Sequence, residues 1–455
     1  MSSLALLKKW MEKHRSELRE DYFHFLRFKS ISADPAYAQE SRRCAEWLQK
    51  YIAHQTDLKA EILETEGNPL VYAEDLRAGS EAETVLVYGH YDVQPVDPIE
   101  LWESDPFEPV ERGGKIYARG AVDDKGQIFY TTAALRAWKE LGRKWPVNLK
   151  FCIEGEEESA SAGLSKALPK LKGKLKADSL LVVDFDQFDE KTAALTMGAR
   201  GLAVFEIILR GSKGDLHSGA HGGMAYNPNR ALVELLAKVW DAEGRVQIEG
   251  FYDDVLELTE EDLRLYSFCY DKKRYSEEFG IDAIGGEKGR TLSENNGFRP
   301  TFEINGMTGG YTGTGVKTVI PALATAKITC RLVPNQDPKK IGERVKDFLQ
   351  SHVASGMKIQ VNVLGGEAAF RGSDTCSLAK AFARASSEVM ESPCKYIVSG
   401  GSIPIVASMV KHLKVDVVGM GYGLPTDQIH APNEHFEWSR FEKGFLTIAR
   451  AFELL

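Results

Sequence analysis

The sequence predicts an α/β protein with a mixed, mostly parallel sheet that is flanked by helices and interrupted by an α+β insert. Three observations support this fold class. Strand-like apolar runs alternate with helical patterns over the first 190 residues, which is typical of a parallel sheet with crossover helices. Histidine and acidic residues stand where several of these strands end. Near residue 200 the pattern changes to consecutive strands and two long helices.

The first part of the chain is expected to begin with two helices and to continue with alternating strands and helices. Apolar residues recur at helical spacing, and short continuous apolar runs indicate buried strands. Proline at position 146 ends the third helix region, because proline cannot continue a helix. The expected helices are 4–28, 40–52 and 125–141, and the expected strands are 59–63, 70–73, 84–88, 147–153 and 179–183.

The region after residue 200 is expected to form a separate α+β domain. Asn227-Pro228 and Asp337-Pro338 open two helices, since proline is favoured at the first helical position. The expected strands are LAVFEIILRG, TAKITCRLV and MKIQVNVLG, with an acidic helical segment at 253–279 and a glycine- and threonine-rich segment at 285–315. We therefore expect one domain in two segments, 1–199 and 365–455, interrupted by an insert at 200–364. The last segment is expected to form helices at 376–390, 402–412 and 434–455 and a strand at 415–418.

Composition argues against several classes of function. The formal net charge of -9 and the pI near 5.7 leave no basic stripe, so neither nucleic acid nor an anionic membrane is an expected partner. The amphipathic, charged N-terminus predicts no signal peptide, and no apolar run approaches the ~20 residues that cross a bilayer. The six cysteines are scattered without a CxxC pair, which predicts reduced packing residues in a cytoplasmic protein.

Two short patterns resemble catalytic motifs without matching them, and a third catalytic motif is absent. GYTGTGVKT at 310–318 has one residue too many before its lysine for a phosphate loop, and no strand is expected before it. No G-x-S-x-G elbow of a serine hydrolase occurs. His217 and His221 are four residues apart, but the intervening residues lack the glutamate of HExxH.

The residues at the predicted strand ends indicate a metal site. Taken singly, each has an ordinary interpretation: a loop histidine, a helix-capping acid or an exposed acidic turn. Taken together, two histidines and at least three carboxylates suit a pair of divalent ions bridged by one carboxylate and one water. The set comprises His90, Asp92, Asp123, the glutamates at 156–158, Asp184 and His430.

Nine motifs in order carry a resemblance that covers almost the whole chain. They are GHYDVQPV, ARGAVDDKGQ, EGEEESAS, the 184 segment leading to LTMGARG, DLHSGAHGG with NP, TVIP, RLVPNQDP, GGSIP and HAPNE. The chain resembles the co-catalytic zinc peptidase family of carnosinases and cytosolic non-specific dipeptidases. Carboxypeptidase G, aminoacylase, acetylornithine deacetylase and succinyl-diaminopimelate desuccinylase are relatives of that family.

The resemblance implies a role for each residue of the metal site. The metal ligands would be His90, Asp123, Glu158, Asp184 and His430. Asp123 would bridge the two ions, and the peptide bond that follows it is often cis in the family. Asp92 would orient His90, and Glu157 would be the general base. A one-residue shift along the glutamate run is the alternative register. Ala160 stands where relatives commonly have glycine.

The resemblance also implies that 200–364 is a lid and dimerisation domain and that 1–199 and 365–455 form the catalytic domain. His217 would reach the site of a neighbouring subunit and stabilise the oxyanion there. Arg331 would bind a substrate carboxylate, and Thr318 and Ser402 would form hydrogen bonds with the substrate. Without the resemblance, His217 is more simply a solvated loop residue and Arg331 a surface charge at a strand end.

Three functions follow as expectations. The first is a cytoplasmic, homodimeric dipeptidase with two metal ions per subunit, Zn²⁺ being expected and Mn²⁺ the alternative, that cleaves peptides with a free C-terminal carboxylate. The second keeps the site but acts on N-acyl or N-carbamoyl amino acids. The third is a catalytically silent binding or scaffold protein, which its divalent-metal content would distinguish.

Overall fold

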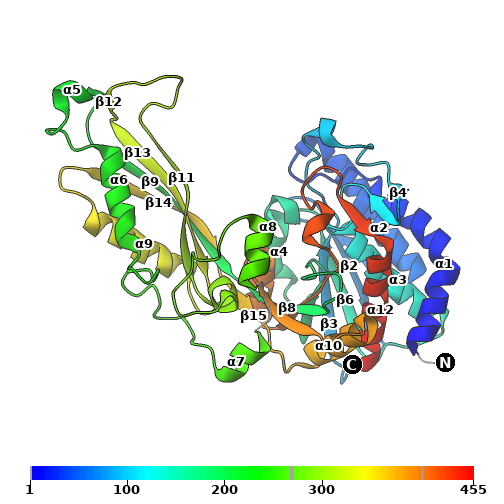
Figure 1. Ribbon diagram of the computed structural model, residues 1–455. Coiled ribbons are helices and arrows are strands. Elements are labelled where there is room, and N and C mark those ends of the chain that lie inside the picture. Colours follow the sequence, from blue (N-terminus) through cyan, green and yellow to red (C-terminus); the bar gives the residue numbers. More distant parts are fainter. Residues whose placement is uncertain (1–2, 267–270, 402) are drawn as a thin grey trace. The chain divides into compact units, whose positions relative to one another are not determined.

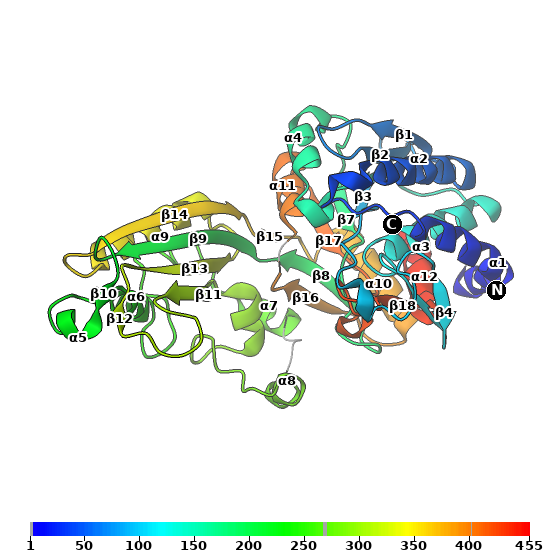
Figure 2. The same cartoon turned by 90° about the horizontal axis from the view of Figure 1, so that it is seen from above.

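The computed structural model describes residues 3–266, 271–401 and 403–455, and the chain divides into two compact units. Unit 1 comprises Met1–Gly198, Gly372–Ile397 and Pro404–Leu455, and unit 2 comprises Ala199–Arg371 and Val398–Ile403. Figures 1 and 2 show the elements of both units. The domains expected from the sequence, 1–199 with 365–455 and 200–364, stay a prediction.

Unit 1 is built on a mixed sheet whose central strands are parallel. The strand order is β1-β2-β6-β3-β7-β17-β8, and β16 also pairs with β8. Neighbours from β6 to β17 are parallel, while β1 and β2 at one edge and β8 near the other pair antiparallel. The bounds are β1 Lys59–Leu63, β2 Leu70–Asp75, β3 Thr84–His90, β6 Asn148–Glu154, β7 Ser179–Val182, β8 Ala194–Ala199, β16 Lys395–Ser399 and β17 Asp416–Gly419.

Helices cover both faces of this sheet, as expected for central parallel strands. Helix α12 packs on α3 and on α10 on one face, and α1 packs on α3 and α12; α4 and α11 pack together on the other face (Figure 2). The helices are α1 Ser3–Leu26, α2 Ala38–Gln55, α3 Lys125–Glu140, α4 Ala162–Leu171, α10 Ser377–Met390, α11 Pro404–Leu413 and α12 Trp438–Leu454. A small three-stranded sheet of β4 Val110–Arg112, β5 Lys115–Tyr117 and β18 His435–Glu437 completes the unit. The α/β class with a mixed sheet is confirmed.

Unit 2 is an antiparallel sheet with helices on one face. The strand order is β11-β13-β9-β14. Along β9 buried residues alternate with partly exposed ones, so one face holds the core, into which α6 and α9 pack. The bounds are β9 Gly201–Arg210, β11 Thr301–Gly309, β13 Leu323–Leu332, β14 Lys358–Glu367, α6 Pro228–Leu236 and α9 Pro338–His352. Shorter elements are β10 Leu216–His217, α5 Ser218–His221, α7 Glu260–Leu265, α8 Lys272–Phe279, β12 Val319–Ile320 and β15 Phe370–Arg371.

Two details of unit 2 differ from the expectation. Within the described part of 253–279 the helical pattern yields only the short helices α7 and α8. The glycine-rich segment contains the nine-residue strand β11, which the sequence did not indicate because its two glycines weaken the strand pattern. Strand β11 ends at Gly309, directly before GYTGTGVKT, so the statement that no strand precedes that motif was wrong. Strand β12 follows the motif instead of the helix that a phosphate loop requires.

Among the described residues, no helix is both long and apolar enough to cross a membrane.

Candidate metal centre

Four adjacent strands of unit 1 deliver the predicted ligands to one edge of the sheet. Parallel strands β6, β3, β7 and β17 end at the same edge, which is where ligands collect in α/β sheets. His90 is the last residue of β3, Asp184 follows β7 by two residues, and the loop after β17 leads to His430. Glu157 and Glu158 follow β6 in the 3-10 turn Glu157–Ser159.

Asp123 lies between the two histidines. Its Oδ1 is 3.1 Å from Nε2 of His90, and its Oδ2 is 2.9 Å from Nε2 of His430. Asp184 Oδ1 lies 3.6 Å from Nε2 of His90, and Glu158 Oε2 lies 3.3 Å from Nε2 of His430. One carboxylate is thus shared by two histidine-carboxylate groups. This is the arrangement that a bridged pair of ions requires.

Hydrogen bonds and close packing fix the segment from 89 to 92. Asp124 accepts a hydrogen bond from the backbone N–H of His90 at 3.0 Å, and the peptide bond between Asp123 and Asp124 is cis, as the resemblance implied. A Cβ on Gly89 would lie 2.5 Å from Oδ2 of Asp124, so only glycine permits this approach. Because Nδ1 of His90 is 3.1 Å from the carbonyl oxygen of Asp92, Nε2 is left facing the carboxylates.

Asp92 also positions the glutamate turn. Its two carboxylate oxygens accept hydrogen bonds from the backbone N–H groups of Glu157, at 3.2 Å, and Glu158, at 3.1 Å, and its Oδ1 lies 3.4 Å from Nδ1 of His90. Gln94 donates from Nε2 to Oε2 of Glu158 at 2.7 Å. Sequence reasoning gave Gln94 no role, although it stands two residues after Asp92 in GHYDVQPV. The turn ends at Ala160, whose φ of 73° lies in the left-handed region that favours glycine.

The electrostatics of the cluster are those of a cation site. Burial raises the pKa of Glu157 to about 9, with Asp184, Glu158 and Asp123 adding to the rise, and burial likewise raises the pKa values of Glu158 and Asp184. Hydrogen bonds to Asp123 and Glu158 raise the pKa of His430 to about 10. A divalent cation would favour ionised carboxylates and neutral imidazoles, and it would remove the repulsion among the acids.

The donor atoms fit divalent metal ions. Two groups of three residues each bring their ligand atoms within 4.8 Å of one another. One group is His90, Glu157 and Asp184, and the other is His90, Asp123 and Glu158. Imidazole nitrogen and carboxylate oxygen are ligands that Zn²⁺ and Mn²⁺ accept. Glu157, for which a base role is expected, is therefore also within reach of a metal. The His90 side chain is fully buried whereas that of His430 is 52% exposed, so the cluster is open at His430.

The sequence profile of this chain agrees with the geometry. Residues 86–454 match the family model described as Peptidase family M20/M25/M40. The chain belongs to this family. It is accordingly a hydrolase of the metallopeptidase class, and the resemblance stated from the motifs is confirmed.

Relatives of this M20 chain include two curated dipeptidases and a solved carboxypeptidase. The Cys-Gly metallodipeptidase dug1 of Schizosaccharomyces pombe is 33% identical, over 79% of this chain and 77% of the relative. The human Beta-Ala-His dipeptidase is 30% identical, over 84% and 77% respectively. The M20 family metallo-carboxypeptidase Sso-CP2 from Sulfolobus solfataricus superposes with a TM-score of 0.81 at 33% identity, covering 96% of this chain and 99% of that one.

The remaining predicted residues of this M20 chain belong to unit 2 or are not described. His217 ends β10 and pairs with Val319, and the backbone N–H of Ser218 donates to the carbonyl of Thr318 at 3.1 Å, so His217 and Thr318 are neighbours. Arg331 lies near the end of β13, opposite Thr301. Within unit 2 the length of β13 therefore separates Arg331 from the His217 loop. Ser402 lies outside the described residues.

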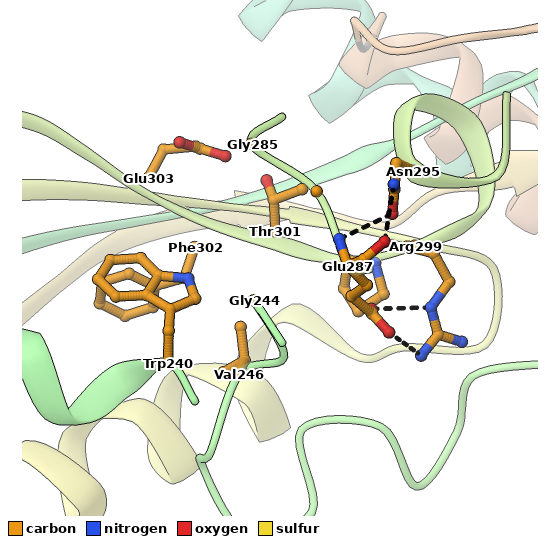
Figure 3. Close-up of a pocket in the computed structure, with 12 residues that line it drawn as sticks. Trp240, Gly244, Val246, Gly285, Glu287, Asn295, Arg299, Thr301, Phe302 and Glu303 are labelled. Carbon is orange, nitrogen blue, oxygen red and sulfur yellow. Dashed lines mark hydrogen bonds and ion pairs between the residues drawn. The ribbon is translucent and has the colours of Figure 1, made fainter. Parts of the chain in front are cut away.

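Unit 2 of the protein contains a cavity of about 120 Å³ (Figure 3). It lies beside Phe302 and Glu303 of β11, and Trp240 forms one wall with its ring against Phe302. One of its two acids, Glu287, is paired with Arg299 at 2.9 and 3.0 Å. The cavity contains none of the predicted site residues, and this pairing argues against Glu287 as a ligand.

Proposed function

We propose that this chain is a two-metal dipeptidase that hydrolyses short peptides with a free C-terminal carboxylate. The observation that supports the proposal most is the Asp123 carboxylate, which lies between His90 and His430 with the half-buried acid Glu157 beside them. The proposed ligands are those expected from the sequence: His90, Asp123, Glu158, Asp184 and His430. Zn²⁺ is the proposed metal, with Mn²⁺ as the alternative.

The names of the relatives support the substrate class. Two of them are called dipeptidases and one is called a carboxypeptidase. Dipeptidases and carboxypeptidases both release a residue that carries a free C-terminal carboxylate. We therefore place the peptide bond next to that carboxylate in the proposed reaction.

Glu157 is the proposed general base. Bound divalent ions would polarise the peptide carbonyl and make a nearby water more acidic. The Glu157 carboxylate would accept the proton of the attacking water and return it to the leaving amine. Asp92 would hold Glu157 and Glu158 in place through their backbone N–H groups, as the 3.2 and 3.1 Å hydrogen bonds indicate.

Substrate contacts and a second subunit complete the proposal. Arg331 would bind the C-terminal carboxylate through its guanidinium, and Thr318 and Ser402 would hydrogen-bond the peptide. His217 would stabilise the developing oxyanion in the site of a partner subunit within a homodimer. Thr318 and Arg331 are separated by most of β13, which supports an assignment of the His217 loop and Arg331 to the sites of different subunits.

Hydrolysis of a substrate panel tests the proposal. The purified protein, loaded with Zn²⁺ or Mn²⁺, would be assayed on free dipeptides, the same dipeptides with amidated C-termini, and N-acetyl amino acids, each with and without a chelator. We expect chelator-sensitive cleavage of the free dipeptides alone. Cleavage of only the acylated compounds would assign the protein to the deacylase alternative. Absence of bound metal and of any hydrolysis would contradict the enzyme assignment.

A further inference from the structure

Glu434 is a buried acid that follows His430 by four residues. The side chain of His430 contacts Asp123, whereas Glu434 faces the loop at 119–123 that carries Asp123. It is fully buried. The residue was part of the motif HAPNE in the sequence but received no role there. What it contacts explains how the two ligand-bearing loops are held together.

The Glu434 carboxylate accepts four hydrogen bonds from the 119–123 loop. Oε2 accepts from Nη1 of Arg119 at 2.8 Å and from the backbone N–H of Gly120 at 2.9 Å. Oε1 accepts from the backbone N–H groups of Val122 at 3.0 Å and Asp123 at 3.2 Å. One side chain thus holds three backbone N–H groups of one loop, including that of Asp123 itself.

The charge of Glu434 is matched by Arg119. Both side chains are 1% exposed, and a buried charge needs a partner and hydrogen bonds to be tolerated. Arg119 is fixed in turn, because its Nη2 donates to the carbonyl of Pro95 at 3.0 Å and its guanidinium lies 5.3 Å from the ring centroid of Trp102. The backbone of Ala118 also donates to the Glu434 carbonyl at 3.1 Å. Both the main chain and the side chain of Glu434 therefore bind this part of the chain.

We propose that Glu434 is a positioning residue that fixes Asp123 as the shared ligand of both metal ions. This inference rests on the proposed function. By holding the Asp123 backbone from the segment that also carries His430, Glu434 sets the position of the Asp123 carboxylate relative to His430. Its carboxylate contacts Arg119 and backbone N–H groups of the 119–123 loop, so it acts through Asp123.

Replacing Glu434 by glutamine tests this role with little change in shape. In either orientation of the amide, an –NH₂ group would face two groups that are themselves donors, so at least two hydrogen bonds are lost. Groups that orient metal ligands typically contribute roughly tenfold to a hundredfold to metal affinity. We expect E434Q to bind Zn²⁺ or Mn²⁺ about tenfold to a hundredfold more weakly than the wild type.

Glu437 provides the matched control. It lies three residues further along, and its carboxylate accepts from Ser439 instead of from the 119–123 loop. E437Q should keep the metal affinity of the wild type. E434D is the second variant, because it keeps the negative charge beside Arg119 but is one methylene too short to hold both pairs of donors. It should also lose metal affinity, which keeps the inference testable if E434Q does not fold.

Metal affinity would be measured by competition with a chromophoric chelator, on protein shown to be folded by circular dichroism. Visible spectra of the Co²⁺-loaded proteins would report the ligand geometry independently of activity. Weaker binding and an altered spectrum in E434Q or E434D, but not in E437Q, would support the inference. Unchanged affinity and spectra in a folded variant would overturn it. A wild type that binds no divalent metal would instead contradict the proposed function.

Discussion

At the residue scale, Asp92 connects two parts of the candidate metal centre, because its carboxylate accepts from the backbone N–H groups of Glu157 and Glu158 and lies 3.4 Å from Nδ1 of His90. His90, Asp123 and Asp184 could be named because each stands at or near an element boundary, and boundary residues of parallel strands meet at one edge. The role of Asp92 toward two backbone N–H groups could not be predicted. A hydrogen bond to the main chain of a residue 65 positions away leaves no pattern in the sequence.

The role of Glu157 can be tested by substitution. We expect E157Q to keep its metal but to lose roughly 10²- to 10⁴-fold in kcat, the usual contribution of a general base. The neighbouring Glu156 is the matched control, since its carboxylate accepts from the backbone N–H of Gly163 at 2.9 Å and lies outside the metal-ligand sets. E156Q should retain turnover. The reverse result, with E156Q inactive and E157Q active, would establish the alternative register of the glutamate run.

The buried carboxyl of Glu154 should make the free energy of unfolding depend on pH. Burial raises the pKa of this carboxyl to about 8, although the hydroxyls of Tyr88 and Ser161 donate to its Oε1 at 2.6 and 2.9 Å. The folded state therefore holds a proton that the unfolded state releases near pH 4.5, so the contribution to stability is full below that pH. It is lost as the pH rises toward 8.

Glutamine at position 154 imitates the protonated acid, because its oxygen can accept both hydroxyls. Each pKa unit corresponds to about 1.4 kcal/mol. The free energy of unfolding of E154Q minus that of the wild type should therefore increase by roughly 3 kcal/mol from pH 5 to pH 8. Urea unfolding of the chelator-treated proteins at both pH values measures this difference. Parallel pH profiles of the two proteins would contradict the assignment.

At the scale of elements, strongly patterned segments were predicted and weakly patterned ones were not. Helix α3 and strands β3 and β6 have long apolar runs, and their expected bounds lie within one or two residues of the observed ones at most ends. Strand β11 was missed because its partner β13, and not its own composition, makes it a strand. Tertiary pairing of this kind overrides local propensity.

The start of α3 depends on a glycine. A Cβ at Gly126 would lie 2.1 Å from the carbonyl oxygen of Ala121 and 2.7 Å from the hydroxyl of Tyr22. Alanine gains about 1 kcal/mol in helix propensity, but the carbonyl belongs to the loop that carries Asp123 and cannot move freely. We expect G126A to lower the free energy of unfolding by roughly 1–3 kcal/mol, as overpacking does, and also to weaken metal binding.

Gly173 supplies the control for that substitution. A Cβ there would have no neighbour within 4 Å, so G173A should unfold at nearly the wild-type urea concentration. Urea denaturation with chelator present separates the packing effect from loss of metal. Equal stability of G126A and G173A would show that the loop yields to the added methyl group.

At the scale of the whole molecule, the fold class was predictable because apolar strands alternate with helical patterns, and the family was predictable because nine separated motifs occur in one order. A homodimer stays a proposal, and physical reasoning alone did not indicate it, since a loop histidine and a strand-end arginine are ordinary surface residues. The five cysteines that the structure describes are free. A cytoplasmic location stays a prediction.

The proposed homodimer predicts that two inactive variants restore each other. In E157Q the base is missing, and in H217A the oxyanion contact is missing from the partner's site. A mixed dimer would contain one complete site, made of Glu157 from one chain and His217 from the other. After dissociation and random reassociation of equal amounts, we expect about a quarter of wild-type activity by this counting. Activity no higher than the sum of the separate variants would place His217 in the site of its own chain.

The position of β17 has a consequence for the order in which the molecule can mature. This strand lies between β7 and β8 in the middle of the sheet, yet it is encoded after residue 415, and His430 and Glu434 are encoded later still. During synthesis on the ribosome, β7 and β8 therefore lack the strand between them until Asp416–Gly419 has been made. A product released early would carry His90, Asp123 and Asp184 without the strand that closes the sheet. Assembly of the candidate metal centre is thereby tied to synthesis of the chain as far as Glu434.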